Sequence, residues 1–401
     1  MKRRLLFITF YFPPDLDAGS FRARALVDEL EAQAGDEWDI DVVTTMPNRY
    51  HTYDAKGEAF EQRGSVTIRR IPLPDHKSGI HDQSRAFLAY AKQVLRLIKG
   101  TEYDGVFATT SRQAGGVLGA WIANRRGVPF YLDVRDIFVD TLEDLLRGSP
   151  LKVVLPAVRA AERYMLASAS GVNVVSAGFL SYFEARRYKR RFTVYPNGID
   201  DEFLELGTPE PTWGLGQKTV LYAGNIGAGQ GLHRIVPGFA KRLGPEWRVQ
   251  VVGDGGKRRE LEDELQKHGV DNVQILDPVP RSQLVQMYQQ ADVLFLHLND
   301  YKAFRRVLPS KIFEYAASGK PILAGVAGHA ESFLEENVDN AALFSPCDVE
   351  AGAEALNTLR LEATPRKSFI DQYARGAIVR RMASDILATF GTPKDAKAPQ
   401  T

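Results

Sequence analysis

Short apolar runs alternate with longer helical segments along nearly the whole chain, and the series occurs twice. The first series begins with RLLFITF at residues 4–10 and ends with RFTVYPN at 191–197. The second begins with TVLYAG at 219–224 and reaches PILAGV at 321–326. Such alternation is typical of parallel sheets covered by helices on both faces. The sequence therefore predicts two doubly wound, Rossmann-like α/β domains.

The length of the chain supports this division, because 401 residues exceed what one hydrophobic core usually organises. We expect an N-terminal domain over residues 1–200, a Pro- and Gly-rich linker over 201–218 and a C-terminal domain over 219–370. A helix over 371–390 is expected to cross back to the first domain, before a disordered polar tail over 391–401. Open α/β sheets bind ligands at the carboxyl ends of their strands, so we expect the functional residues in a cleft between those ends.

The composition excludes several classes of protein. The 51 basic and 50 acidic residues leave no overall field to attract nucleic acid. Cys347 is the only cysteine, which excludes an intramolecular disulfide and indicates a reducing compartment, so we expect the cytoplasm. The start MKRRLLFITFYFPPD resembles a signal peptide, but it lacks a small-residue cleavage site, and a buried first strand accounts for it. No segment reaches the roughly 20 apolar residues that span a bilayer.

A glycine-rich turn follows the first strand of the second domain. The stretch YAGNIGAGQGLHRI at 222–235 places four glycines between a strand and a helix, where the backbone can approach an anion closely. Its spacing is not G-x-G-x-x-G, and no acidic residue ends the next strand before Asp254, which argues against a dinucleotide site. A turn that is merely tight explains the glycines equally well.

The next glycine turn, GDGGKRREL at 253–261, places Lys257, Arg258 and Arg259 at the start of a helix. Cations oppose the helix macrodipole at this end unless an anion lies nearby. A solvated first turn is the alternative interpretation, because exposed surface charges contribute little.

A third segment, LPSKIFEYAASGKP at 308–321, is an almost apolar helix with two opposite charges in its first turn. Ser310 is the expected N-cap, Lys311 the first helical residue and Glu314 the fourth. An ordinary intrahelical ion pair would contribute only about 0.2–0.5 kcal/mol. In the functional interpretation, Lys311 holds a diphosphate and Glu314 accepts hydrogen bonds from the vicinal hydroxyls of a ribose. Both interpretations remain open on the sequence alone.

These three segments resemble glycosyltransferase family 4, as do ADVLFLHL at 291–298, YPNGID at 195–200, and FPPD at 12–15 with the following Gly19. The resemblance covers residues 1–390. It implies a retaining enzyme of the GT-B fold, with the acceptor bound by the first domain and a UDP-sugar donor bound by the second.

Two segments are similar to one branch of that family. DVRDIF at 133–138 and PSKIFEY at 309–315 match the WbuB-like branch of bacterial O-antigen L-fucosamine transferases. This similarity implies transfer of an N-acetylated hexosamine or deoxyhexosamine. The implied acceptor is a glycan or an undecaprenyl-diphosphate-linked saccharide in cell-surface polysaccharide synthesis.

The chain departs from the family pattern at two positions. Glu314 matches the second acid of the family's E-x7-E motif, the one associated with the ribose, but the first acid would fall at Arg306. Direct carboxylate recognition of the transferred sugar is therefore left open. Gln230 stands where the family usually has a basic residue, so Lys311 and Lys257 are the candidates for the missing positive charge.

The resemblance also implies which residues form the site. The expected donor-binding residues are Gly19, Gly224, Asn225, Gly227, Gln230, Gly253, Lys257, Val279, Ser310, Lys311 and Glu314. Those expected on the acceptor side are Asp17, Arg135 and Asn197, and the catalytic candidates are Arg135, Asp136 and Lys311. A retaining transfer on one face of the sugar needs fixed cations and dipoles at the leaving diphosphate, and Asp136 would assist as a base. A salt bridge between Arg135 and Asp136 at the edge of the core is an equally good explanation of that pair.

We expect neither a metal ion nor another cofactor. Asp15 and Asp17 form a D-x-D triplet, but the loop offers no third ligand, and carboxylates alone hold Mg²⁺ poorly. The 7 histidines form no H-x-x-x-H cluster.

Two basic amphipathic stretches, FEARRYKRRF at 183–192 and SRAFLAYAKQVLRLIKG at 84–100, suit helices that lie on an anionic membrane surface. Packed helices with solvated basic faces are the alternative. Because the implied acceptor is lipid-linked, a peripheral position on the inner face of the cytoplasmic membrane fits the first interpretation. Two other functions fit the expected fold: a non-hydrolysing UDP-sugar 2-epimerase, which needs acid and base residues, and a non-catalytic nucleotide-sugar-binding protein.

Overall fold

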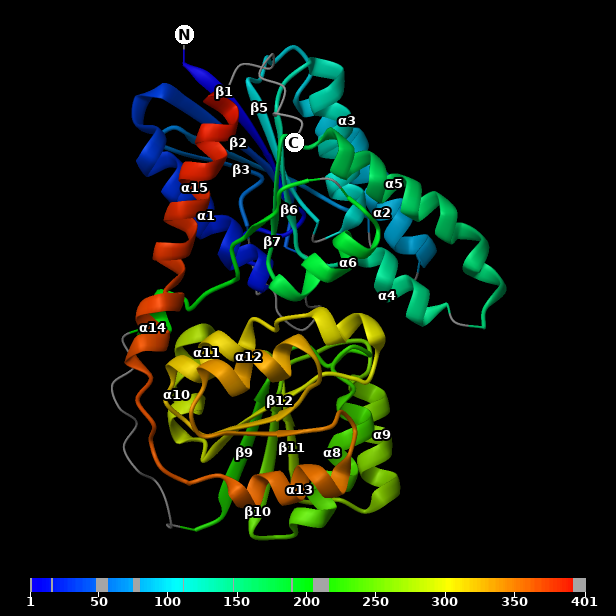
Figure 1. The fold of residues 1–401 in the computed structure, drawn as a ribbon, viewed down its shortest axis with the longest axis vertical. Coiled ribbons are helices and arrows are strands. Elements are labelled where there is room, and N and C mark those ends of the chain that lie inside the picture. Colours follow the sequence, from blue (N-terminus) through cyan, green and yellow to red (C-terminus); the bar gives the residue numbers. More distant parts are fainter. Residues whose placement is uncertain are drawn as a thin grey trace. The chain divides into compact units, whose positions relative to one another are not determined.

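The computed structural model of the chain consists of two α/β units (Figure 1). Unit 1 comprises Met1–Asn197 and Gly376–Thr401, and unit 2 comprises Gly198–Arg375. Residues 80–83 and 145 are described by their backbone alone. The residues that the structure describes are 2–15, 17–47, 57–74, 80–110, 112–146, 148–188, 190–204 and 216–391.

Unit 1 is built on a sheet with the strand order β3-β4-β2-β1-β5-β6-β7-β8. Its strands are β1 (Arg3–Ile8), β2 (Trp38–Thr45), β3 (Phe60–Arg63), β4 (Val66–Ile71), β5 (Gly105–Thr109), β6 (Phe130–Val134), β7 (Gly171–Val174) and β8 (Thr193–Val194). The apolar strands pair in parallel, so that Phe7 lies opposite Val42 on one side and Phe107 on the other. The sequence analysis missed β3, which pairs antiparallel with β4 at the sheet edge. Its sequence FEQR has no buried residue, so it carries no apolar signal.

Helices cover both faces of this sheet (Figure 1). They are α1 (Ala18–Ala34), α2 (Ile80–Leu97), α3 (Gln113–Arg126), α4 (Phe138–Leu145), α5 (Leu155–Ser168), α6 (Leu180–Ala185) and α15 (Arg375–Gly391), with short 3-10 turns at Gly35–Glu37, Pro150–Val154 and Ala177–Phe179. The C-terminal α15 packs its buried Met382 and Ile386 against Leu30 of α1 and Trp38 of β2. The last helix of the chain thus completes the core of unit 1.

Unit 2 contains a fully parallel sheet with the order β11-β10-β9-β12-β13-β14. Its strands are β9 (Lys218–Ala223), β10 (Trp247–Val252), β11 (Val273–Leu276), β12 (Val293–His297), β13 (Ile322–Gly325) and β14 (Ala341–Phe344). Its helices are α7 (Asp201–Leu204), α8 (Leu232–Leu243), α9 (Arg258–His268), α10 (Arg281–Gln290), α11 (Lys311–Ala317), α12 (His329–Asn337), α13 (Val349–Thr358) and α14 (Lys367–Tyr373), with a 3-10 turn at Lys302–Arg306.

Successive residues of the central strand β9 face opposite layers of helices. Val220 and Tyr222 belong to the apolar cluster of α8, α9 and α13, while Leu221 and Ala223 belong to that of α10, α11 and α12. A strand buried on both faces reads as a continuous apolar run, which is how TVLYAG appears in the sequence. The predicted fold of two doubly wound α/β domains with the GT-B architecture is confirmed.

The chain passes between the units at two places, after Asn197 and before Gly376. The two segments pair within unit 2, because Ile199 N–H donates to Tyr373 O at 2.8 Å and Arg375 N–H donates to Ile199 O at 2.8 Å. Of the expected linker, α7 takes up the first four residues, while 205–215 lie outside the described residues. The expected tail lies outside them from residue 392 onward.

Candidate functional site

The helix α11 carries a buried polar cluster at its start. Lys311 Nζ lies 2.9 Å from Glu314 Oε2, and Tyr288 Oη donates to the same oxygen at 3.0 Å. Glu314 is only 5% exposed, and its neighbours Ile312, Phe313 and Tyr315 are fully buried. The intrahelical ion pair considered for Lys311 and Glu314 therefore exists, but inside the protein rather than on its surface.

A second cation stands on the other side of this carboxylate. Arg281 Nη1 lies 3.7 Å from Glu314 Oε1. Burial alone would raise the pKa of Glu314, but the charges of Lys311 and Arg281 more than offset it, so the pKa lies below its ordinary value. Glu314 is thus ionised at neutral pH and acts purely as a hydrogen-bond acceptor.

Arg281 in turn belongs to a row of alternating charges. It forms an ion pair with Asp200 of the YPNGID segment, and Asp200 also pairs with Arg375. The sequence analysis missed Arg281, although the signal was present: like Lys257, it is a cation at the start of a helix, directly after Pro280. Asp200 and Arg375 could not be found this way, because their partners lie far away in the sequence.

Two glycine turns meet beside α11, at the ends of β9 and β10. A Cβ atom on Gly253 would lie 1.8 Å from the carbonyl oxygen of Gly224, so only glycine fits there. A Cβ atom on Gly224 would lie 3.7 Å from Cε of Lys311. In addition, Ala223 N–H donates to Tyr315 Oη at 3.1 Å, which ties the first turn to the helix.

The predicted donor residues of the glycine loop form one network. Asn225 Nδ2 donates to Gln230 Oε1 at 2.8 Å, and a Cβ atom on Gly227 would lie 2.4 Å from Asn225 Nδ2. The structure therefore brings Gly224, Asn225, Gly227, Gln230 and Gly253 together with Lys311 and Glu314.

Three other predicted donor residues occupy different surroundings. Lys257 forms an ion pair with Glu260, which neutralises it within its own helix. Val279 packs against the apolar cluster that contains Ile312. Ser310 stands at the N-cap position, as expected, but it has helical φ and ψ and its side chain caps no backbone N–H.

His297, at the end of β12, is a further residue that the sequence analysis missed. Its Nδ1 lies 2.6 Å from the carbonyl oxygen of Gln230, and its Nε2 accepts the N–H of Cys347 at 2.9 Å. Because Nε2 accepts, Nδ1 carries the proton and donates to the glycine loop. Burial lowers the pKa of His297 to about 4, so the ring is neutral at physiological pH.

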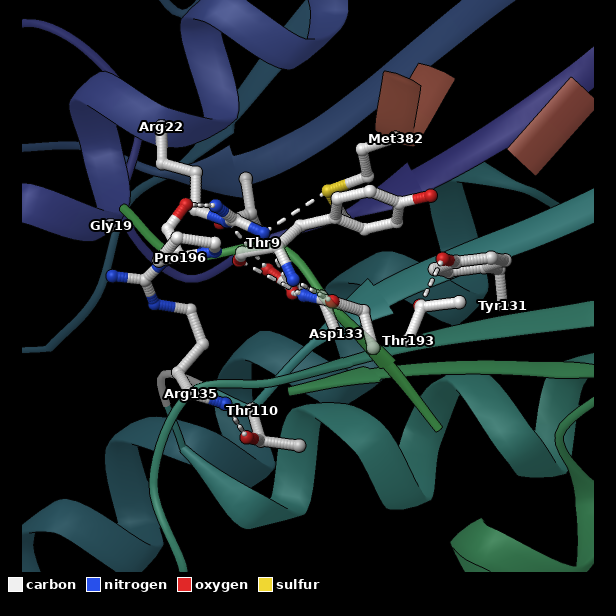
Figure 2. A network of polar contacts seen from close by, with 12 residues as sticks. Thr9, Gly19, Arg22, Thr110, Tyr131, Asp133, Arg135, Thr193, Pro196 and Met382 are labelled. Atoms are coloured by element: carbon white, nitrogen blue, oxygen red, sulfur yellow. Dashed lines mark hydrogen bonds and ion pairs between the residues drawn. The ribbon is translucent and has the colours of Figure 1, made fainter. Parts of the chain in front are cut away.

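Unit 1 has a buried ion pair where β6 ends (Figure 2). Arg22 of α1 donates to both carboxylate oxygens of Asp133, at 3.1 and 3.2 Å, and to the carbonyl oxygen of Pro196 at 2.7 Å. Asn173 Nδ2 donates to Asp133 Oδ1 at 2.6 Å. The pair fixes the start of α1 against the ends of β6 and β7.

The predicted acceptor-side residues lie around this pair. Asp17 caps α1, because its carboxylate accepts from Gly19 N at 2.7 Å. Arg135 follows β6, and its backbone N–H donates to Thr110 Oγ1 at 2.9 Å. Asp136 is exposed, and the salt bridge considered between Arg135 and Asp136 is not formed within the described part of the chain. Asn197 is buried next to Pro196.

The described residues contain no group of three or more His, Cys, Asp or Glu side chains that could hold a metal ion. Within the same ranges, no helix is both long enough and apolar enough to cross a membrane. In the basic stretch 183–192, Arg190 donates to the carbonyl oxygens of Ala169 and Ala167, so this arginine stabilises the fold. On α2, Leu88 is 68% exposed while Tyr90 is buried.

Comparison with protein families assigns both units. Residues 209–375 match the model described as glycosyl transferases group 1, and residues 21–198 match the glycosyl transferase 4-like domain. The chain belongs to the GT-B glycosyltransferases. None of the curated proteins matches this glycosyltransferase in sequence.

Solved structures support the fold of this glycosyltransferase. HepE from Anabaena, in complex with UDP-glucose, is 17% identical with a TM-score of 0.69, over 96% of this chain and 99% of HepE. The α,α-trehalose 6-phosphate synthase from Burkholderia multivorans is 13% identical with a TM-score of 0.68, over 97% of each chain. The lipopolysaccharide outer core galactosyltransferase WaaB is 13% identical with a TM-score of 0.60, over 96% of this chain and 99% of WaaB. At these identities the likeness concerns the fold.

Proposed function

We propose that this glycosyltransferase takes a sugar from a UDP-sugar and transfers it with retention of configuration. The transferred sugar is an N-acetylated hexosamine or deoxyhexosamine. The acceptor is a glycan or an undecaprenyl-diphosphate-linked saccharide in O-antigen-like synthesis. The resemblance of DVRDIF and PSKIFEY to the L-fucosamine transferase branch supports these choices.

The observation that carries the proposal is the ionised, buried Glu314 beside two glycine turns. Its carboxylate accepts hydrogen bonds from the vicinal hydroxyls of the donor ribose. Lys311 and the amide groups of the Gly224 and Gly253 turns lie next to it, where they receive the diphosphate. A UDP-glucose complex of the similarly folded HepE supports a uridine nucleotide as the donor.

In this mechanism the protein stabilises the leaving group. The diphosphate gains negative charge in the transition state, and Lys311 with the loop amides stabilises that charge. The departing phosphate oxygen takes the proton of the acceptor hydroxyl, with the exposed Asp136 as an assisting base. No metal ion or cofactor takes part in this scheme.

The protein acts in the cytoplasm, at the inner face of the cytoplasmic membrane. The exposed Leu88 and the exposed Leu97 of α2 support this placement, because the same helix also carries the basic residues Arg85, Lys92 and Arg96. These basic residues would face the anionic headgroups.

The test is incubation with UDP-sugars, with and without a lipid-diphosphate-linked saccharide. Release of UDP that requires the acceptor supports transfer. Formation of a new UDP-sugar would indicate the 2-epimerase instead, and binding without turnover would indicate a nucleotide-sugar-binding protein. Product anomers assigned by NMR test retention.

A further inference from the structure

The Arg135 side chain stands without a partner among the described residues. Among the residues that the structure describes, none forms a hydrogen bond or an ion pair with its guanidinium, and Nη1 is buried. An arginine carries five N–H donors and keeps its proton. Leaving such a group desolvated and unpaired is costly, so a side chain in this state points to a ligand.

The carboxylates around Arg135 are engaged or solvated. Asp133 accepts hydrogen bonds from both Arg22 and Asn173, and Asp17 caps α1. Burial lowers the pKa of the Arg135 guanidinium; Asp133 partly offsets this, and the positive charge of Arg22 adds to the lowering. The charges of Asp17 and Asp136 also partly offset the lowering.

Two further buried polar atoms belong to the segments that carry Gly19 and Pro196. Ser20 Oγ and Asn197 Oδ1 are buried and make no hydrogen bond with the described residues. Ser20 follows Gly19, which lines a small hollow together with Arg22, Asp133 and Arg135. Asn197 follows Pro196, whose carbonyl oxygen accepts from Arg22.

Figure 2 shows how Arg135 is aimed. Arg135 follows β6, and its backbone N–H donates to Thr110, which follows β5. Its side chain extends toward Gly19 and Pro196. Gly19 belongs to the first turn of α1, a helix of 17 residues whose N-terminus carries a partial positive charge. A planar guanidinium beside such a terminus suits a phosphoryl group, which it binds through two parallel hydrogen bonds.

We propose that Arg135, with Ser20, binds a phosphoryl group of the acceptor in unit 1. The inference rests on the proposed function, in which the donor diphosphate is bound by unit 2 through Lys311 and the glycine turns. Of the two acceptors proposed there, it selects the one that carries a phosphoryl group. The phosphoryl chemistry is shared by the diphosphate of a lipid-linked acceptor and by that of the donor, so the experiment has to separate them.

The experiment is calorimetric titration of inorganic pyrophosphate into the full chain. It is done once without UDP and once after the protein has been saturated with UDP. The wild-type protein should bind pyrophosphate in both cases. Arg135→Gln should lose about tenfold or more of that affinity, the scale of hydrogen bonds to a charged group, while its UDP affinity stays within about twofold. The control is Arg163→Gln, on the exposed face of α5, which should bind both ligands like the wild type.

Two outcomes would overturn the inference. Unchanged pyrophosphate binding by Arg135→Gln would remove the site, and an equal loss of UDP binding would assign Arg135 to the donor. A failure of UDP to bind the wild type would refute the proposed donor instead, and pyrophosphate titration of the free protein would still test Arg135.

Thermal unfolding of Arg135→Met separates a ligand-binding role from a structural one. Without phosphate in the buffer, the melting temperature should rise by about 2–4 °C, because an unpaired buried charge is removed. A guanidinium that stabilises the fold predicts a fall instead. With UDP saturating the donor site, pyrophosphate should raise the melting temperature of the wild type but not that of Arg135→Met. Ser20→Ala is the second variant, with a smaller loss of pyrophosphate affinity expected.

Discussion

Arg281 Nη1 lies 3.7 Å from Glu314 Oε1, while the other oxygen of the same carboxylate lies 2.9 Å from Lys311 Nζ. Two cations from two helices therefore hold one buried acid in its ionised form. A carboxylate in this state is costly to bury unless it is paired on both sides. The pairing explains how an almost apolar helix carries a charged residue at the place where the donor is proposed to bind.

Removing the cation at Arg281 should destabilise unit 2. Arg281→Met leaves Asp200 and Glu314 with one cation less each, and we expect the free energy of unfolding to fall by about 1.5–3 kcal/mol. Urea unfolding measures this. Arg305→Met is the matched control, because Arg305 and Asp300 are both exposed and such pairs contribute about 0–1 kcal/mol. Equal effects of the two substitutions would contradict the role of Arg281.

Lys311→Ala should slow the chemical step more than it weakens donor binding. A preorganised donor at a developing charge is typically worth a factor of about 10² to 10³ in kcat. Steady-state kinetics with a UDP-sugar and an acceptor should show this loss with a smaller rise in the donor KM. Lys257→Ala is the control, since Lys257 is paired with Glu260. The opposite pattern would place the phosphate-binding cation in the GDGG turn.

Stability should depend on pH through His297. Its pKa in the folded protein is about 4, below the ordinary value of 6.5. Between these values the unfolded chain takes up a proton that the native ring does not, so stability is lost as the pH falls from about 6.5 toward 4.

Unfolding of His297→Phe over the same pH range tests this prediction. The variant should be less stable than the wild type at pH 7, because it leaves the Gln230 carbonyl and the Cys347 N–H without their partner. Its stability should also change less between pH 6.5 and 4. His268→Phe on α9 should retain the full dependence of the wild type. Parallel curves for wild type and His297→Phe would refute the assignment.

Transferase activity should survive excess EDTA. The scheme uses Lys311 and backbone amides at the leaving diphosphate, so chelation removes nothing that it needs. Rates measured with EDTA, and again with added Mg²⁺ or Mn²⁺, test this directly. A requirement for either ion would bring Asp15 and Asp17 back as candidate ligands.

The sequence predicted what local patterns encode. Strands such as β9 are apolar on both faces, and the glycines of the two turns are required by backbone contacts at the ends of neighbouring strands, so both features appear as short motifs. The spacing of Lys311 and Glu314 likewise predicted their contact, because residues three apart on a helix are neighbours.

Ion pairs between residues far apart in the sequence could not be predicted from such patterns. Asp200 and Arg281 pair although they lie 81 residues apart, and Arg22 and Asp133 pair across 111 residues. Nothing in the local periodicity of either residue indicates its partner, because strand order and helix docking decide it. For the same reason Arg135 appeared as one half of an Arg-Asp pair, whereas its charge interacts most strongly with Asp133, at the end of β6.

Calorimetric titration of UDP into the wild type and Glu314→Gln tests the donor site most directly. If Glu314 accepts from the ribose hydroxyls, the variant should keep its fold and lose about 1.5–3 kcal/mol of binding free energy, the scale of hydrogen bonds to a charged group. Glu350→Gln, an exposed residue of α13, should bind UDP like the wild type. Equal UDP affinity of Glu314→Gln and the wild type would contradict the account, and would leave Glu314 as a structural ion pair.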